Sequence, residues 1–425
     1  MSAIQQFGMI HSQLVNYIIQ HNTSMIIPHS IFQTVLRIPS CISFNNKRVL
    51  FKRMLIHHIQ QQMQQSGRGM NSIHLSVSRK RILQDTFSAL GGKSVSEMYN
   101  RLSIEFKNEK GVDAGGLSRE FFISLSNSIF DQNYALFVPC QNRTTFQPDP
   151  RSLIMDQNNV QIFSFVGRII AKAICDEMLM DVHFTKSFFK HILGIPLQFQ
   201  DMEGVDHQMY NSLLWVMQAT SEQLEQAETT FEINMDYFGQ MRSIELVPNG
   251  KNIPVTIANR AAYVQLMTES RMSNDIKQQI QAFKRGFYQL IPLRLISIFD
   301  VNELELLISG LPDIDVEDMK KNTMYEGTYT EESNVIKWFW KAAESFSQEE
   351  RARLVQFITG SSKVPVGGFI HDRLKICHIS GGDRRLPSAH TCFKQLDLPN
   401  YSTYEILREK LLFAINEGGE EFNIV

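Results

Sequence analysis

The step Gly310-Leu311-Pro312 sets the domain organisation of this chain, because it ends one helical pattern and separates two large units. The stretch 283–313 predicts two helices, and a glycine followed closely by a proline is a typical helix stop. The chain has 425 residues, several times the length of one ordinary domain, so two or three folding units are expected. We therefore place the boundary between the two large units at this step.

The upstream unit is predicted to be mainly helical with one small β insert. Apolar residues at helical spacing predict a buried amphipathic helix over 162–174, and a second helix is expected over 206–217. The runs 230–239 and 243–257 look strand-like, and Pro248-Asn249-Gly250 is the turn expected between strands. This pattern predicts a helix-plus-hairpin unit set into a helical domain that begins near His74.

The two ends of the chain also carry helical signals. In the first 70 residues the predicted apolar faces comprise Leu14, Ile18 and Ile19, and Val49, Phe51, Met54 and Ile56. Downstream, the capping boxes Ser347-x-x-Glu350 and Ser402-x-x-Glu405 open two helices. The second helix should bury one face made of Leu407, Leu411, Ala414 and Ile415. Strand-like runs at 373–379 and 393–398 make this unit α+β.

Composition limits the partners and the compartment. Lys+Arg 42 against Asp+Glu 44 leaves no global basic field that would favour nucleic acid. The 5 cysteines form no CxxC pair, which argues against a disulfide framework or a zinc site and favours a reducing cytoplasmic or nuclear compartment. The chain shows neither an apolar run that could span a bilayer nor a signal peptide, so we expect no membrane insertion. No metal or other cofactor is expected.

Two glycine-rich segments were candidates for phosphate loops. GGKS at 91–94 lacks the glycine that such a loop needs five residues before Gly92, where Phe87 stands, so a P-loop is excluded. GVDAGGLSRE at 111–120 has glycines that could cradle an anion at a helix start, but we favour the simpler interpretation, a tight turn before a helix.

The candidate chemistry lies in RRLPSAHTCFKQLDLPNY at 384–401. Cys392 stands between a polar loop and an apolar strand, with His390 two residues before it and Arg384 and Arg385 nearby. Positive neighbours lower the pKa of a thiol, and a thiol with a pKa near the ambient pH exchanges thioesters well. Spacing alone leaves three interpretations open: a buried small side chain, a thioester-exchanging nucleophile, or a Cys–His protease.

The segment LPSAHTCFKQLDLPNY resembles the active-site signature of HECT ubiquitin ligases. Seven further segments resemble HECT segments in the same order: EKGVDAGGLSREFF (109–122), NYALFV (133–138), FSFVGRIIAKAI (163–174), FTKSFFKHILG (184–194), NELELLISGLPDID (302–315), IKWFWKAAESF (336–346) and VQFITGSSKVPVGGF (355–369). The segments ELLISGLP and KVPVGGF are most similar in sequence to the very large Mule/Tom-type branch of this family.

The resemblance implies a bilobal α+β fold and a ubiquitin-protein ligase. Its parts would be an N-terminal helical extension (1–70), an N-lobe (71–310) carrying a conjugating-enzyme-binding subdomain (205–270), a hinge (311–313) and a C-lobe (314–425). The implied partners are ubiquitin, a ubiquitin-conjugating enzyme and protein substrates. The implied location is the cytoplasm or the nucleus.

The resemblance also implies roles for single residues. Cys392 matches the ubiquitin-accepting cysteine, and Thr391 and His390 complete the family's HTC motif and would shape its loop. Phe422 matches a phenylalanine near the C-terminus that is needed for transfer. The hinge would bend at Gly310, Leu311 and Pro312. The candidates for the apolar groove that binds the conjugating enzyme are Leu213, Leu214, Phe231, Ile233 and Phe238, although any of them could instead pack the subdomain's own core.

Some positions depart from the family's pattern, and other functions stay open. Lys394 replaces the asparagine that usually follows HTCF, and it would add a cation near the thiolate. Pro139 and Met272 fall where some members use aromatic residues to hold a second ubiquitin, which argues against that exosite here. The chain could also be a scaffold that binds conjugating enzymes without forming a thioester, or a cysteine hydrolase that removes ubiquitin.

Overall fold

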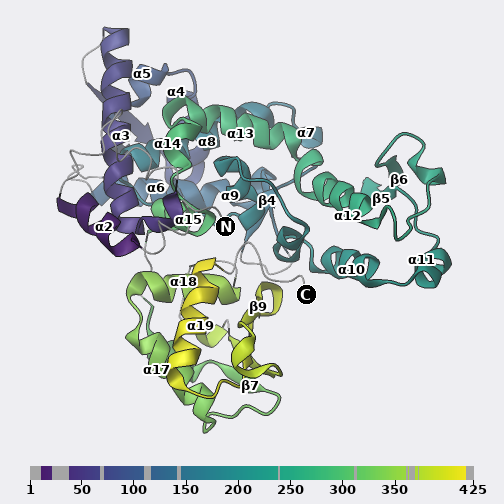
Figure 1. Ribbon diagram of the computed structural model, residues 1–425. Coiled ribbons are helices and arrows are strands. Elements are labelled where there is room, and N and C mark those ends of the chain that lie inside the picture. The colour runs from purple at the N-terminus through teal and green to yellow at the C-terminus, as the bar shows by residue number, and fades with distance from the viewer. Residues whose placement is uncertain are drawn as a thin grey trace.

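The computed structural model describes residues 11–21, 38–67, 71–109, 116–140, 145–237, 240–310, 314–359, 362, 369–371 and 373–417. Three masses are visible in Figure 1: the helical N-lobe, the subdomain that projects from it, and the C-lobe. The mixture of many helices with small sheets confirms the predicted α+β fold. Within the described ranges, no helix has the length and apolar character that a membrane span requires.

The N-lobe is a helical body with two small pairs of strands. Its elements are α2 (Ser12–His21), α3 (Phe44–Ser66), β1 (Ser72–Val77), α4 (Ile82–Leu90), α5 (Val95–Met98), β2 (Arg101–Phe106), α6 (Gly116–Ile129), β3 (Phe137–Pro139), β4 (Phe146–Pro148), α7 (Ser152–Met155), α8 (Asn159–Cys175), α9 (Lys186–Leu193), α13 (Lys277–Leu290), α14 (Leu293–Ile296) and α15 (Val301–Ser309). The parallel pairing of β1 with β2 was not predicted, since strands far apart in sequence leave no hairpin signal.

Helices α8 and α13 pack backbone to backbone at the centre of the N-lobe. A Cβ atom added to Gly286 would lie 1.7 Å from the Ser164 carbonyl oxygen, and one added to Gly167 would lie 2.1 Å from the Phe283 carbonyl oxygen. The predicted buried helix over 162–174 is confirmed in α8. Only glycine permits so close an approach of the two helix backbones.

The predicted apolar face of the N-terminal helix α3 was partly wrong. Phe51 is buried, but Val49 and Ile56 are each 45% exposed, and Leu50 and Leu55 are the buried residues instead. Apolar residues surround much of this helix, so spacing alone cannot choose a face. The choice is made by packing against the N-lobe, where the ring of Phe51 lies edge-on to Phe299 at 5.3 Å.

The stretch 283–313 forms three helices rather than the predicted two. Pro292 ends α13 and begins the short α14, because proline cannot continue a helix. Helix α15 ends at Ser309, and the next residue, Gly310, has a φ of 82°, a positive value suited to glycine. Leu311, Pro312 and the rest of the predicted hinge lie outside the described residues.

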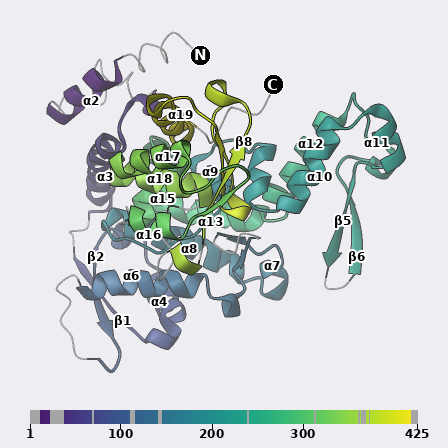
Figure 2. The same ribbon diagram turned by 90° about the horizontal axis from the view of Figure 1, so that it is seen from below.

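The subdomain has a hydrophobic core of its own. Its elements are η6 (Phe199–Gly204), α10 (His207–Gln218), α11 (Ser221–Ala227), β5 (Glu232–Tyr237), β6 (Gln240–Glu245), α12 (Arg260–Glu269) and the π-helical η8 (Ser270–Asn274). The core runs from Met202 to Met272 and is separate from the core shared by the N-lobe and the C-lobe. Seen from below in Figure 2, β5 and β6 extend away from the N-lobe body on the side opposite α3.

The predicted position of the hairpin turn in the subdomain was wrong. The hairpin pairs β5 directly with β6, from Glu232 opposite Glu245 to Tyr237 opposite Gln240. The glycine of the expected turn, Gly250, instead accepts a hydrogen bond from the Phe231 amide at 3.1 Å. A Cβ at this glycine would lie 2.3 Å from the Phe231 carbonyl oxygen, so the turn-like sequence serves a close backbone approach.

The C-lobe packs helices on a four-stranded sheet. Its elements are α16 (Val316–Lys321), β7 (Met324–Glu326), α17 (Asn334–Ser345), α18 (Gln348–Thr359), β8 (Lys375–Ile379), β9 (Ser388–His390), η11 (Thr391–Phe393), β10 (Gln395–Pro399) and α19 (Tyr404–Glu417). The strand order is β7-β8-β10-β9, in which β9 alone runs antiparallel to its neighbour.

One of the two predicted capping boxes in the C-lobe is confirmed and the other is wrong. Glu350 and Ser347 exchange hydrogen bonds with each other's backbone amides. Ser402 instead donates its hydroxyl to Asp383 at 2.7 Å, and Thr403 accepts from the Ile406 amide at 3.3 Å. Because the Ser402 hydroxyl bonds to Asp383, which is distant in sequence, it does not cap α19. The predicted buried face of α19 is confirmed.

Candidate active site

The HTC motif lies at the tip of a β-hairpin. His390 on β9 is opposite Gln395 on β10, and between them η11 makes a single turn. Lys394 closes this turn with a φ of 51°, and its amide donates to the Thr391 carbonyl at 3.2 Å. A short loop that ends in a left-handed residue is a common hairpin connection. Cys392 is therefore at the hairpin tip, although its side chain lies outside the described residues.

The imidazole of His390 lies between two carboxylates. Its Nδ1 is 3.1 Å from Oε1 of Glu203, and its Nε2 is 3.2 Å from Oδ2 of Asp397. The bonds to Asp397 and Glu203 raise the pKa of His390 to about 10, against the opposing effect of partial burial. Burial would raise the pKa of Asp397, but hydrogen bonds from His390 and Gln395 lower it overall. At neutral pH the ring is an imidazolium that donates from both nitrogens.

This protonation state limits what His390 can do chemically. A general base must be unprotonated at the working pH, and a pKa of about 10 leaves His390 charged there. A Cys–His protease with His390 as its base is therefore not supported. The two hydrogen bonds instead fix the ring, so His390 can orient the hairpin that carries Cys392.

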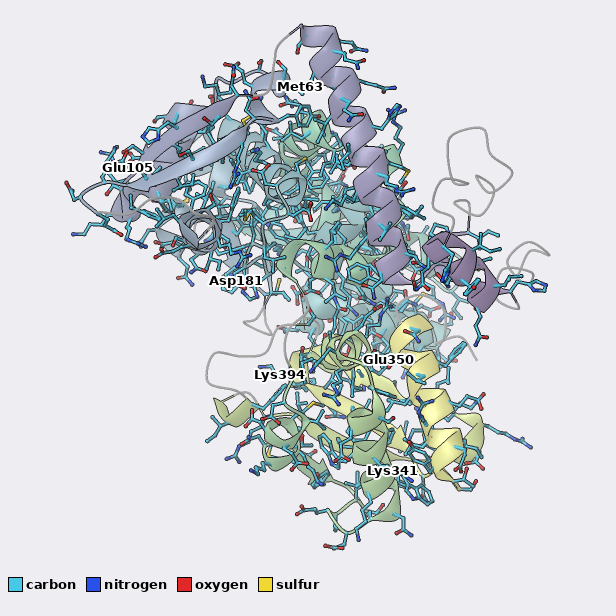
Figure 3. The ribbon with its side chains drawn as sticks, turned by 90° about the vertical axis from the view of Figure 1, so that its left-hand side faces the viewer. Met63, Glu105, Asp181, Lys341, Glu350 and Lys394 are labelled. Atoms are coloured by element: carbon cyan, nitrogen blue, oxygen red, sulfur yellow. The ribbon has the colours of Figure 1, made fainter. Side chains whose placement is uncertain are left out.

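The hairpin tip also contacts the base of the subdomain. Glu203 belongs to η6, so its bond with His390 joins the C-lobe to the subdomain. Phe393 is 53% exposed, and its ring lies edge-on to His207, the first residue of α10, with centroids 4.8 Å apart. Figure 3 shows Lys394 at the end of the C-lobe that faces the N-lobe. The motif is thus positioned where the C-lobe and the subdomain meet.

The residues before the motif hold the loop rather than form a charged cluster. The Tyr401 hydroxyl donates to the Arg385 carbonyl at 2.7 Å, and the Arg385 guanidinium donates to the Ser380 carbonyl at 3.2 Å. Pro387 is buried, while Arg384 is exposed. These hydrogen bonds of Arg385 therefore help to hold the loop that precedes the motif.

Lys394 occupies a backbone conformation that lysine adopts at a cost. Its φ of 51° and ψ of 43° are left-handed, a region in which asparagine is enriched and lysine is not. Partial burial lowers the pKa of its amino group. The conformation gives a physical reason why asparagine suits this turn.

The five residues predicted for the conjugating-enzyme groove do not form one exposed surface. Leu213, Phe231 and Ile233 are only 1%, 4% and 7% exposed and pack the subdomain's core. Leu214 is half-buried, and Phe238 lies outside the described residues. The burial of Leu213, Phe231 and Ile233 leaves a partner little of these three side chains to contact.

A concave surface of about 490 Å³ opens beside α10 and is lined in part by Met209, Trp215 and Tyr263. The Trp215 side chain is 43% exposed. Trp215 was not among the groove residues predicted from the sequence. The helical spacing could have indicated it, because Leu213 and Val216 form the buried face of α10 and Trp215 lies outside that face. A large exposed aromatic is a common anchor for partners.

A buried charged network joins the N-lobe to the C-lobe, and no sequence pattern predicted it. Glu303 on α15 accepts from Lys47 Nζ at 2.6 Å and from Arg353 Nη2 on α18 at 3.4 Å. Burial, with the nearby Asp300 charge, raises the pKa of Glu303 to about 6. Glu305 accepts from the Gln356 amide of the same C-lobe helix.

Two further predicted features have no structural description. Phe422 lies outside the described residues, as does most of the hinge. Across the part of the chain that the structure describes, no three His, Cys, Asp or Glu side chains gather as a metal site.

The small α+β lobe thus carries a cysteine at a hairpin tip, and the same hairpin contacts the subdomain of the helical lobe. The HECT-domain (ubiquitin-transferase) family matches residues 123–425, and the chain belongs to this family. The resemblance drawn from the motifs is confirmed.

Three relatives show the branch of the family. The chain is 41% identical over 421 residues to E3 ubiquitin-protein ligase TOM1-like of Neurospora crassa. It is 41% identical over 431 residues to E3 ubiquitin-protein ligase UPL1 of Arabidopsis thaliana, and 40% identical over 429 residues to E3 ubiquitin-protein ligase HUWE1 of Mus musculus. These alignments cover 97%, 98% and 99% of this chain but 10%, 11% and 10% of the relatives. The chain thus spans about a tenth of their length.

Proposed function

We propose that this protein is a ubiquitin-protein ligase that accepts ubiquitin as a thioester on Cys392 and transfers it to lysine amino groups of protein substrates. Membership of the HECT-domain family supports the reaction class. The observation that carries the proposal is the position of the HTC turn. The bond between His390 and Glu203 holds this turn against the base of the subdomain.

The reaction would proceed in two acyl transfers. In loading, the Cys392 thiolate attacks the thioester carbonyl of ubiquitin on the conjugating enzyme, a new S–C bond forms, and the enzyme's thiolate leaves. In delivery, a neutral lysine amine attacks the new thioester, a C–N bond forms, and the Cys392 thiolate leaves. The amine loses its proton to solvent or to a substrate base. Thioester exchange is near balance, so positioning supplies most of what the protein contributes.

His390 would act as a positioning residue. Its bond to Asp397 stays within the C-lobe hairpin, whereas its bond to Glu203 crosses to the subdomain. Release of the second bond would free the hairpin without disturbing the first. The tip could then face the conjugating enzyme at one stage and the acceptor lysine at another.

The conjugating enzyme would bind beside α10. The concave surface there presents Trp215 and Tyr263, while the buried Leu213 supports the helix from within. An exposed aromatic beside an apolar hollow suits a loop that brings apolar side chains. Among the groove residues predicted from the sequence, we retain Leu214 as a contact and treat Phe231 and Ile233 as core.

Movement of the lobes would be assisted by polar contacts that join them, since Glu303 and Glu305 of α15 accept from Arg353 and Gln356 of α18. Charged and amide side chains can exchange protein partners for water, as domain closure requires. The bend would fall at Gly310, Leu311 and Pro312. Phe422 would pin the C-lobe to the N-lobe after loading. A cytoplasmic or nuclear compartment suits the reaction, because the nucleophile must stay a free thiol.

The decisive experiment mixes the protein with a ubiquitin-charged conjugating enzyme and separates the products on a non-reducing gel. We expect a ubiquitin adduct that reductant removes and that Cys392→Ala abolishes. Cys377→Ala is the matched control, because burial and the neighbouring Glu326 raise the pKa of the Cys377 thiol to about 11 and keep it protonated.

The same gel separates the alternatives. A scaffold would bind the conjugating enzyme and form no adduct. A hydrolase would cleave ubiquitin esters when no conjugating enzyme is present. An adduct that survives Cys392→Ala and disappears with Cys377→Ala would move the active site and refute the proposal.

A further inference from the structure

A second concave surface, of about 330 Å³, lies along α13 in the N-lobe. It is lined by His191 from α9, Ser273 from η8, and Lys277, Gln281, Lys284 and Arg285 from α13. No residue of the C-lobe or of the HTC hairpin lines it. We call this surface the basic pocket, and the transfer reaction proposed above does not use it.

Positive charge is concentrated on this part of the chain. Between Asp275 and Asp300 the sequence holds four cations and no acidic residue, although the whole chain has a net charge of −2. Three of these cations, Lys277, Lys284 and Arg285, line the pocket. Their spacing of seven and eight residues places them on one side of the helix.

These three cations lack a neutralising partner among the residues that the structure describes. Carboxylates elsewhere in this region are already engaged: Asp201 pairs with Lys190 at 3.1 Å, and Asp206 and Asp275 share Arg271. Lys277 also stands in the first turn of α13, which has no side-chain cap, and the helix dipole is unfavourable for a cation there. An anion in the pocket would offset both effects.

Burial strengthens the need for negative charge. Burial lowers the pKa of the Lys284 amino group. Burial and the Lys284 charge also lower the pKa of His191, although its bond with the Met272 carbonyl opposes them. That bond, 2.9 Å from Nε2 to the carbonyl oxygen, ties the pocket wall to η8. π-helical segments such as η8 are often found at functional sites.

We propose that the basic pocket binds a phosphomonoester dianion. Arginine can hold two phosphate oxygens with its planar fork, and lysines add point charges. The Ser273 hydroxyl and the Gln281 amide can supply further donors on other sides of the pocket. Donors from more than one element suit the three oxygens of a phosphate better than the two of a carboxylate. The dianion could come from free phosphate or from a phosphorylated serine of a polypeptide.

The test is isothermal titration calorimetry on the whole chain at low salt. The ligands are inorganic phosphate, a short phosphoserine peptide, and the same peptide with glutamate in place of phosphoserine. We expect saturable binding of phosphate and of the phosphopeptide, with the glutamate peptide at least tenfold weaker. Tighter binding of the phosphopeptide than of phosphate would identify a polypeptide as the source, and the reverse order would identify free phosphate.

Variants connect binding to the pocket. Lys284→Gln with Arg285→Gln should weaken phosphate binding at least tenfold. Lys320→Gln with Lys321→Gln on α16 removes the same net charge elsewhere and should leave binding unchanged. Because Lys284 is half-buried, the single changes Lys277→Gln and Arg285→Gln at exposed positions provide variants that should fold normally, and each should weaken binding severalfold.

Three results would overturn the proposal: no saturable phosphate binding, equal binding of the glutamate peptide, or binding unaffected by the Lys284 and Arg285 changes. Formation of the Cys392 adduct should be the same in all pocket variants. Failure of the pocket proposal would therefore be distinguishable from failure of the proposed ligase function.

Discussion

Helices α8 and α13 meet backbone to backbone, whereas α15 and α18 meet through buried polar side chains. In the first pair, Gly286 leaves no room for even one added carbon atom. In the second pair, Glu303 and Arg353 form an ion pair across the two lobes. Packing by shape makes the N-lobe a rigid block, while polar pairs can be exchanged. The contrast supports the proposed function, in which the N-lobe holds the conjugating enzyme while the C-lobe moves.

The largest effect should come from filling the glycine contact. Gly286→Ala would place a carbon against the Ser164 carbonyl oxygen, so α8 and α13 must separate and the surrounding core must shift. We expect a loss of about 3 kcal/mol or more in the free energy of unfolding, measured by urea denaturation. Gly92→Ala is the control, because nothing lies within 4 Å of its added Cβ. Similar stabilities for the two variants would show that the close contact of α8 with α13 does not make the N-lobe rigid.

Removing Lys47 should cost about as much, but for an electrostatic reason. Its amino group is buried against Glu303, and loss of one partner leaves a poorly compensated charge inside the protein. Lys47→Met should lower the free energy of unfolding by about 3 kcal/mol. On the same helix, Lys52 pairs with Glu177 at the surface, with side chains 56% and 64% exposed. Lys52→Met should therefore change stability by less than about 1 kcal/mol.

If Lys47→Met proved as harmless as Lys52→Met, the buried network would not stabilise the fold. Other contacts between α15 and α18 would then stabilise the two lobes against each other.

A smaller effect, dependent on pH, should come from His390. Its folded-state pKa of about 10 lies above the ordinary value of 6.5, so its contribution is complete below about pH 6.5 and is lost as pH rises toward 10. His390→Gln should cost about 1 kcal/mol at pH 7, a figure reduced for solvent screening because the side chain is 40% exposed. Urea denaturation of both proteins between pH 7 and 9.5 should show this difference shrinking.

Phe393→Leu is a control for His390 at the same docked tip, and its effect should not change with pH over this range. A His390→Gln cost that stayed constant or grew with pH would contradict the imidazolium assignment.

The smallest effect should be a gain. Lys394→Asn replaces a lysine in a left-handed conformation by a residue that adopts it more readily, and should stabilise the protein by about 0.5 kcal/mol. Lys375 lies in the neighbouring strand β8 with ordinary extended backbone, so Lys375→Asn should bring no such gain. Loss of stability in Lys394→Asn would show that the lysine side chain makes contacts that outweigh the backbone strain.

Much of the fold was predictable where local pattern and burial coincide. The spacing of apolar residues located α8 and the buried face of α19, and the Ser347 capping box marked the start of α18 correctly. Prediction failed where a distant group competed with a local one. Ser402 looked like a cap until Asp383 took its hydroxyl, and Gly250 looked like a hairpin turn until Phe231 required the close approach.

The candidate site also has features that local sequence predicts and features that depend on contacts between distant residues. The order of residues is enough to define the HTC motif, its place between two short strands, and the family to which the chain belongs, because these depend on residues adjacent in the chain. The folded chain, in contrast, is needed to see that Glu203 and Asp397 hold His390 as a cation, and that Glu303 joins Lys47 to Arg353. Those contacts join residues far apart in sequence, and their strength depends on burial and distance, which the order of residues does not specify.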